Sequence, residues 1–305
     1  MKLHHLTLIS IIFLTSAFSS VHSEEHTTAA NDTAKASVAL NLAWEATGLK
    51  NPESIVYDKK RDRLYVSNVD GSPLDKDGKG SISILSLDGK IIEPAWIIGL
   101  DAPKGLAIYD DKLYTADLDT LVEIDIEAGN ISNYYYAKEA KLLNDVTARS
   151  NGEIYVADTL TTSIYRLKDG IFEAWINSSA QLENPNGLLA EEDRLLVAAW
   201  GIMTDGFKTE VPGHLKTVNY NDKTIKSLGN GKPVGNLDGI ESDGHGDYYV
   251  TDWMIGKLFL ITPSGTATEL LQLEQGLGDL TVLKSKNLMI LPLMFGNKLM
   301  AYTIK

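Results

Sequence analysis

The sequence predicts an all-β fold, namely a six-bladed β-propeller with four antiparallel strands per blade. Three observations support this prediction. Six short turn motifs recur at intervals of 40 to 52 residues, a short apolar run follows each motif, and no segment shows a strong helical periodicity. Repeats of this length that hold several strands each are typical of propellers. We assign residues 37–305 to this domain.

Each repeat opens with a turn that leads into a first strand. One variable residue sits two positions before an apolar residue, and proline precedes it in three of the six copies. Proline fixes the approach of the chain, and glycine lets the backbone turn into the strand. The six motifs are PESI (52–55), PKGL (103–106), LNDV (143–146), PNGL (185–188), LDGI (237–240) and LGDL (277–280).

The remaining strands follow each motif in a constant order. A second apolar run begins nine to eleven residues after the variable residue, with turn residues between, so each unit starts with a β-hairpin. Third strands are predicted at residues 81–87, 121–126, 163–167, 214–220, 257–261 and 298–304. Fourth strands are predicted in five units, at residues 95–98, 131–137, 172–176, 225–228 and 267–273.

The sixth unit lacks a fourth strand because the sequence ends. Residues 38–46 precede the first unit and have the character of a fourth strand. Their Ala43-Trp44 pair matches Ala95-Trp96 and Ala174-Trp175, which lie in two predicted fourth strands. We therefore expect the N-terminal strand to close the last blade beside residues 298–304.

The N-terminus indicates export. Residues 1–23 have the pattern of a secretory signal peptide, with Lys2, an apolar run and small residues before the expected cleavage point. The alternative is an uncleaved anchor. Residues 24–36 are polar and are expected to form a flexible tail. We expect a secreted or periplasmic protein that has no membrane association after cleavage.

Composition excludes several kinds of partner and site. Without the signal peptide the chain loses only one base, which leaves 27 bases and 41 acids and a formal charge of −14. Such a surface repels nucleic acid, so no nucleic-acid partner is expected. The chain has no cysteine, which excludes zinc–thiolate sites and cysteine nucleophiles. A small-molecule substrate and a monomeric protein are expected.

The variable residues of the six motifs are expected to form a ring. The first strand of each blade lines the central channel of a propeller, so the six side chains gather at one mouth. Asparagine and aspartate are also common in turns. Four oxygen-bearing residues at one repeated position nevertheless favour a site for one divalent cation, most readily calcium. The ring consists of Glu53, Lys104, Asn144, Asn186, Asp238 and Gly278.

These motifs resemble the senescence marker protein / gluconolactonase / luciferin-regenerating enzyme family. The resemblance covers residues 41–305 and includes related propellers, the diisopropyl fluorophosphatases and paraoxonases. It implies a six-bladed propeller with a divalent cation on its axis, often calcium. It also implies that the metal ligands are Glu53, Asn144, Asn186 and Asp238.

Two features depart from the family pattern. Sugar lactonases carry arginine two residues before the first asparagine ligand, where this chain has Leu142. Paraoxonases use a histidine dyad, but the folded region here has only His214 and His245. Leu142 therefore argues against an aldonolactone as substrate.

The resemblance and the ring together suggest roles for individual residues. Asp238 is the expected general base or nucleophile, because a carboxylate beside a cation can reach activated water. Lys104 is expected to attract an anionic substrate or to stabilise an oxyanion, and padding of the channel mouth is the alternative. Asp145 is a further substrate-site or base candidate.

Residues 200–213 are expected to form a long loop at the rim of the pocket. Trp200 is expected to form an apolar wall together with Met203, Phe207 and Trp253, and packing between blades is the alternative for the two tryptophans.

Three functions remain open from the sequence. The leading one is a calcium-dependent hydrolase of lactones or related esters. The second is a non-catalytic propeller that binds a ligand or a protein and uses the cation structurally. The third is a propeller of the strictosidine synthase type with other chemistry. The complete ligand set favours the first over the third, whereas Leu142 weakens the first relative to the second.

Overall fold

The computed structural model describes residues 38–305. The assigned signal peptide (1–23) and tail (24–36) lie outside these residues. Within the described part, no helix is long and apolar enough to cross a membrane.

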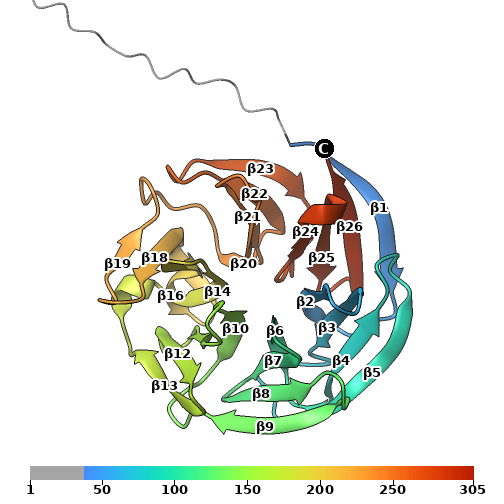
Figure 1. Cartoon of the computed structure of the whole chain (residues 1–305). Helices are drawn as coiled ribbons and strands as arrows, with labels where there is room; N and C mark the ends of the chain where they lie inside the picture. Colours follow the sequence, from blue (N-terminus) through green and yellow to red (C-terminus); the bar gives the residue numbers. More distant parts are fainter. Residues whose placement is uncertain (1–37) are drawn as a thin grey trace, which may run out of the picture. The chain divides into compact units, whose positions relative to one another are not determined.

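The predicted six-bladed propeller is confirmed: six four-stranded antiparallel sheets surround a central axis, with the first strand of each nearest the centre (Figure 1). Blade 1 consists of β2 (Pro52–Asp58), β3 (Arg63–Asn68), β4 (Gly80–Leu85) and β5 (Ile91–Leu100). Blade 2 consists of β6 (Pro103–Tyr109), β7 (Lys112–Asp117), β8 (Thr120–Asp125) and β9 (Asn130–Tyr136). Blade 3 consists of β10 (Leu143–Ala148), β11 (Ile154–Asp158), β12 (Ser163–Lys168) and β13 (Ile171–Ile176). Blade 4 consists of β14 (Pro185–Ala190), β15 (Arg194–Ala199), β18 (Leu215–Asn219) and β19 (Ile225–Ser227). Blade 5 consists of β20 (Leu237–Ser242), β21 (Tyr248–Asp252), β22 (Lys257–Ile261) and β23 (Ala267–Gln272). Blade 6 consists of β24 (Thr281–Leu283), β25 (Leu288–Leu293), β26 (Lys298–Ile304) and β1 (Leu40–Thr47).

The N-terminal strand closes the ring of blades as predicted. β1 pairs antiparallel with β26, from Leu40 opposite Ile304 to Thr47 opposite Lys298. Figure 1 shows the two ends of the propeller side by side as a blue and a red strand. Closure leaves β26 with hydrogen-bonded neighbours on both sides, so it has no free edge.

The core is divided into layers between neighbouring blades. Six buried clusters each combine apolar residues from two adjacent blades. The middle of second strands such as β15 is apolar because it is covered on both faces. Leu195 belongs to the layer toward blade 3, and Leu196 belongs to the layer toward blade 5. Successive side chains of a strand point to opposite faces, which explains why both are buried.

The repeated Ala-Trp pair of the outer strands has a packing role. Trp96 of β5 lies with its ring centre 5.1 Å from that of Tyr65, and Trp175 of β13 lies 5.0 Å from Tyr155. Each tyrosine lies on the second strand of the blade that holds its tryptophan. The outer tryptophan therefore covers the tyrosine and completes the layer.

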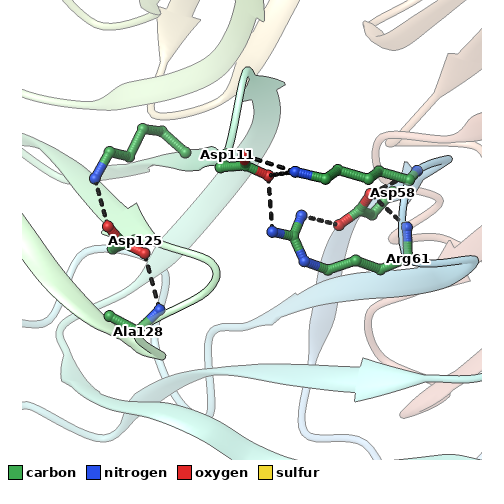
Figure 2. Close-up of polar contacts among 7 residues, drawn as sticks. Asp58, Arg61, Asp111, Asp125 and Ala128 are labelled. Atoms are coloured by element: carbon green, nitrogen blue, oxygen red, sulfur yellow. Dashed lines mark hydrogen bonds and ion pairs between the residues drawn. The ribbon is translucent and has the colours of Figure 1, made fainter.

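Hairpin turns at the far ends of the inner strands tie blades 1 and 2 together. The Arg61 guanidinium contacts Asp58 of its own turn at 3.0 Å and Asp111 of the next blade at 2.7 Å (Figure 2). In the same view, Asp125 accepts a hydrogen bond from the backbone N–H of Ala128 at 2.9 Å. These ends of the blades are thus fixed by carboxylates that cap turns.

Three details differ from the sequence-based prediction. Residues 200–213, expected to be a loop, contain a two-stranded hairpin of β16 (Gly201–Asp205) and β17 (Lys208–Pro212). The outer strand of blade 1 runs over Ile91–Leu100 and is longer than the expected 95–98. Two 3-10 turns also occur, η1 (Ala180–Leu182) and η2 (Lys284–Lys286). The hairpin pairs a mixed set of residues, for example Ile202 with Val211 and Asp205 with Lys208, so apolar periodicity does not reveal it.

Candidate metal and active site

The ring residues are aimed at the axis by a repeated irregularity of the inner strands. In blade 4, Pro185 pairs with Ala199, but Leu188 pairs with Val197, so the inner strand has one extra residue. The same shift occurs at the start of β2, β6, β10 and β20. A β-bulge bends a strand and redirects a side chain. The ring residue lies inside this irregular segment in all five blades.

Five ring residues line one cavity of about 120 Å³ at the mouth of the channel. We call it the axial cavity. All five side chains are buried, with at most 9% of any residue exposed. Its polar members are Glu53, Lys104, Asn144, Asn186 and Asp238, and its apolar members are Pro73, Leu142, Trp200, Phe207, Trp253 and Met294. Gly278 occupies the sixth position and contributes no side chain.

Several oxygen atoms in this cavity have unused acceptor capacity. Glu53 Oε2 and Asn186 Oδ1 are buried and have no hydrogen-bond partner among residues 38–305. The amide nitrogen of Asn144 donates to Thr159 Oγ1 at 3.3 Å, which leaves its Oδ1 as the free end. Buried acceptors without donors are costly unless another group compensates them. The donor set therefore fits a hard cation.

The charges of the cavity are only partly balanced by protein groups. Burial raises the pKa of Glu53 to about 8, although the positive charge of Lys104 opposes this shift. Burial and the nearby charge of Glu53 raise the pKa of Asp238. Burial lowers the pKa of Lys104 to about 8, and Glu53 opposes this change. The charge of Lys104 offsets only part of the effect of burial on Glu53, so an added cation would favour the ionised forms of both acids.

The residues of the ring are not a cluster of the kind that binds transition metals. Among residues 38–305 there is no group of three or more histidine, cysteine, aspartate or glutamate side chains placed to hold a metal ion. The ring instead combines two carboxylates with two amides. Its hard oxygen atoms are those that calcium uses in proteins.

In four blades, the last residue of the second strand holds the turn that leads to the ring residue. Asp117 accepts hydrogen bonds from the backbone N–H of Asp101 (2.9 Å) and Ala102 (2.7 Å), just before Lys104. Equivalent contacts are made by Asn68 to Lys50, by Asp158 to Lys141 and Leu142, and by Asp252 to Asn236. The sequence reasoning missed these residues. The signal was visible, because four of the six second strands end in asparagine or aspartate.

Asp145 lies beneath the ring rather than in the axial cavity. It lines a separate cavity of about 170 Å³ inside the channel, together with Asp279 of blade 6. Its two oxygens accept hydrogen bonds from the backbone N–H of Val146 and Leu188, both at 2.6 Å. Asp145 thus links blades 3 and 4, and its position favours a structural role. Asp279 has the equivalent place in the sixth motif.

Aromatic side chains form one wall of the axial cavity. The Trp200 ring centre lies 6.0 Å from that of Phe207 and 5.9 Å from that of Trp253. Trp200 also donates a hydrogen bond to the carbonyl of Phe207 at 2.8 Å, which fixes the tip of the β16–β17 hairpin. Met203, expected in this wall, is not among the cavity residues. Trp200 therefore both packs between structural elements and faces the cavity.

Neither histidine of the folded region joins this site. His245 is exposed in the turn between β20 and β21, at the other end of the blade. His214 is buried on blade 4 and does not line the axial cavity. The polar chemistry of the cavity thus rests on carboxylate, amide and ammonium groups.

Fold and site define a six-bladed propeller with an oxygen-rich pocket at one mouth of its channel. No protein-family model matches this sequence, and no curated protein matches it. Among solved structures, a candidate gluconolactonase is 18% identical, with a TM-score of 0.62 over 89% of this chain and 93% of that one. A streptogramin B lyase is 14% identical, with a TM-score of 0.58 over 88% of this chain and 98% of that one. At these identities the likeness establishes a shared fold, and it supports the resemblance to gluconolactonase-like propellers at that level.

Proposed function

We propose that this protein is a divalent-cation-dependent hydrolase of lactones or related esters, with calcium as the cation. The observation that carries the proposal is the set of four oxygen donors in one buried cavity. Glu53 Oε2 and Asn186 Oδ1 are buried without partners in the described part of the chain, and Asn144 and Asp238 face the same space. A low-identity structural likeness to a candidate gluconolactonase supports the same reaction class.

The four proposed ligands would have different roles. Glu53 and Asp238 would supply the two negative charges that balance a divalent ion, and the two asparagines would add neutral oxygens. When bound, the cation supplies Lewis acidity toward an ester carbonyl and makes nearby water more acidic. Asp238 accepts the proton of the attacking water, because its carboxylate lies in the cavity where the reacting carbonyl must sit.

Lys104 carries a positive charge in the axial cavity, beside the proposed metal ligands. Its ammonium group donates to the carbonyl oxygen of Ala102 at 2.8 Å, so its place is fixed. Hydrolysis of a lactone yields a carboxylate. We assign Lys104 to stabilise the negative charge that develops on the substrate and remains on the product.

The wall of the cavity favours an apolar or aromatic substrate. Leu142, Trp200, Phe207 and Trp253 supply most of the apolar lining. A sugar acid would leave hydroxyl groups facing these side chains without partners, which is costly. An aryl ester or an alkyl-substituted lactone fits the lining better.

The deciding experiment is a hydrolysis panel of lactones and aryl esters, measured with and without a chelator. We expect turnover that the chelator abolishes and that calcium restores. Absence of turnover across a broad panel would contradict the hydrolase proposal. Turnover that survives complete chelation would contradict the role of the cation.

A second function is favoured by one observation. The axial cavity is small, about 120 Å³, and is closed on one side by the β16–β17 hairpin. A propeller that binds a small ligand or a protein and uses the cation structurally would fit a narrow cavity. In that case the protein hydrolyses no compound of the panel, but calcium still raises its melting temperature.

Location and assembly complete the proposal. We propose export to a secreted or periplasmic location on the basis of residues 1–23, followed by action as a monomer on a small molecule. The acidic composition is consistent with an absence of nucleic-acid partners. Detection of the processed chain outside the cytoplasm would test this point.

A further inference from the structure

A second polar cluster lies on blade 4, outside the axial cavity. Ser227 Oγ is 2.8 Å from His214 Nε2, and His214 Nδ1 is 3.5 Å from Glu183 Oε2. Lys216 Nζ completes the cluster at 3.0 Å from Glu183 Oε1. None of the four residues lines the axial cavity. A hydroxyl, an imidazole and a carboxylate thus stand in the order found in serine hydrolases.

The antiparallel order of blade 4 brings these distant residues together. Glu183 precedes the inner strand β14, His214 precedes β18, and Ser227 ends β19, opposite Lys216. All three positions therefore lie at one end of the sheet. β19 is the outermost strand of the blade (Figure 1). Three strand spacings separate it from the inner strand, or roughly 14 Å.

The surroundings of His214 define its tautomer. Lys216 can only donate hydrogen bonds, and its ammonium nitrogen lies 3.4 Å from His214 Nε2. Nε2 therefore carries the lone pair of the ring. This lone pair accepts the hydrogen bond of the Ser227 hydroxyl, which at 2.8 Å is the nearer of the two donors. Nδ1 then carries the hydrogen that faces Glu183. Burial and the charge of Lys216 lower the pKa of His214, so the ring is a neutral base at neutral pH.

We infer that Glu183, His214 and Ser227 form a second hydrolytic centre, with Ser227 as a nucleophile toward small activated carboxylic esters. Ser227 Oγ forms a bond to the carbonyl carbon, and its proton passes to His214 Nε2. The ester bond breaks as the leaving alkoxide takes that proton, which leaves an acyl-serine. Water, deprotonated by the same nitrogen, then releases the carboxylic acid and restores Ser227.

Access limits the substrates of this centre. Ser227 is exposed, whereas His214 is buried with 8% of its surface exposed, so substrate and water reach the pair from the side of Ser227. Gly231 lies directly against the pair: a Cβ there would come within 2.9 Å of Ser227 Oγ. Its φ of +63° also favours glycine. The substrate must therefore be short and unbranched near its carbonyl group.

The test uses an alkyl fluorophosphonate on the full chain with EDTA present, which removes any contribution of a cation at the axial cavity. Attack by Ser227 Oγ forms an oxygen–phosphorus bond and expels fluoride, while His214 takes the proton. Ser178 is the internal reference, because it is exposed and its hydroxyl contacts only an asparagine in the described residues. Peptide mapping measures both labelling rates in the same digest.

We expect Ser227 to be labelled at least about 100-fold faster than Ser178, the usual scale for a general base. His214→Asn should remove that advantage, and Glu183→Gln should reduce it. Glu127→Gln, a surface change on blade 2, should leave it unchanged. The EDTA in the assay separates this centre from a cation at the axial cavity. Equal labelling of the two serines overturns the inference, and so does fast labelling of Ser227 that persists in His214→Asn.

Hydrolysis of 4-nitrophenyl acetate with EDTA present provides the turnover arm. Loss of this activity in Ser227→Ala, together with its retention in Glu127→Gln, supports the centre. Ser227 is exposed and its hydroxyl is small, so Ser227→Ala should fold normally. Equal activity of wild type and Ser227→Ala overturns the turnover step.

Discussion

The carboxylate of Asp158 accepts a hydrogen bond from the backbone N–H of Leu142 at 3.1 Å and thereby holds the turn that leads to Asn144. A second bond from the N–H of Lys141, at 3.0 Å, engages its other oxygen. Asp158 has no exposed surface. A residue of the second strand thus positions a residue of the first strand that faces the axis.

Removal of this carboxylate should destabilise the protein and disturb the ring. Asp158→Ala leaves the N–H groups of Lys141 and Leu142 without acceptors in a buried turn. We expect a loss of about 1–3 kcal/mol in the free energy of unfolding, measured by urea titration. Asp193→Ala, an exposed control, should change little. Equal stability of the two variants would contradict the role given to Asp158.

Calcium should raise the melting temperature of the wild type. Binding to the native state alone stabilises it by about 2.7 kcal/mol at 100 times the dissociation constant. Glu53→Gln keeps the size of the side chain but removes one charge, so the shift should shrink strongly. Glu192→Gln, on the surface, should respond like the wild type. Scanning calorimetry with and without EDTA gives the measurement, and identical shifts for both variants would exclude Glu53 as a ligand.

Asp238→Asn separates catalysis from metal binding. Asparagine keeps an oxygen ligand but cannot accept a proton at neutral pH. We expect turnover to fall by roughly 100-fold or more even at saturating calcium, the scale for a lost general base. Full recovery at high calcium would leave Asp238 with a ligand role only.

Asn186→Asp is the companion change to Asp238→Asn. It adds negative charge beside Glu53 and Asp238 without adding a base at the reacting position. We expect tighter calcium binding and slower turnover, because extra charge weakens the Lewis acid. A calcium titration of rate, with the best substrate of the panel, tests both effects. Weaker calcium binding by this variant would show that Asn186 Oδ1 does not face the cation.

Phe207 should influence substrate choice through the wall of the axial cavity. Phe207→Ala removes a half-buried ring that lines the cavity and packs on Trp200. We expect kcat/KM for aryl esters to fall about tenfold, equivalent to about 1.4 kcal/mol, with a smaller effect on short aliphatic lactones. Phe295→Ala is the matched control, since Phe295 contacts Trp253 but does not line the cavity. Equal losses for both substrate classes would contradict the assignment.

Glu153 should make stability depend on acid pH. Burial alone would raise its pKa, but hydrogen bonds from Lys168 and other groups outweigh this and lower it to about 2. A carboxyl whose pKa is depressed on folding stabilises the protein above its unfolded pKa, and this stabilisation is lost as the pH falls toward the folded value. The stability gap between wild type and Glu153→Gln should therefore shrink from about pH 5 downward.

Urea titrations at several pH values measure this gap. The surface variant Glu127→Gln provides the control, because Glu127 is exposed. A gap for Glu153→Gln that stays constant between neutral and acid pH would rule out the proposed pH dependence.

The repeat of turn motif and apolar run made the fold predictable from the sequence. Repetition averages out local ambiguity, because six copies agree on the same order of strands. The closing role of β1 followed from a shared Ala-Trp pair and from the missing outer strand of the last unit. The ring residues could be named because the channel lies on the propeller axis, so equivalent positions in different blades must converge there.

The sequence by itself therefore determined the propeller, its closure and the set of residues around its axis. Only the tertiary structure decided which of their neighbours reach the axial cavity. Asp145 follows Asn144 directly, yet a one-residue step along a strand turns a side chain to a different side. Side-chain contacts across neighbouring strands, such as Ser227 with His214, leave no periodic trace in the sequence. Their positions depend on the pairing register of whole strands, which only the packed sheet determines.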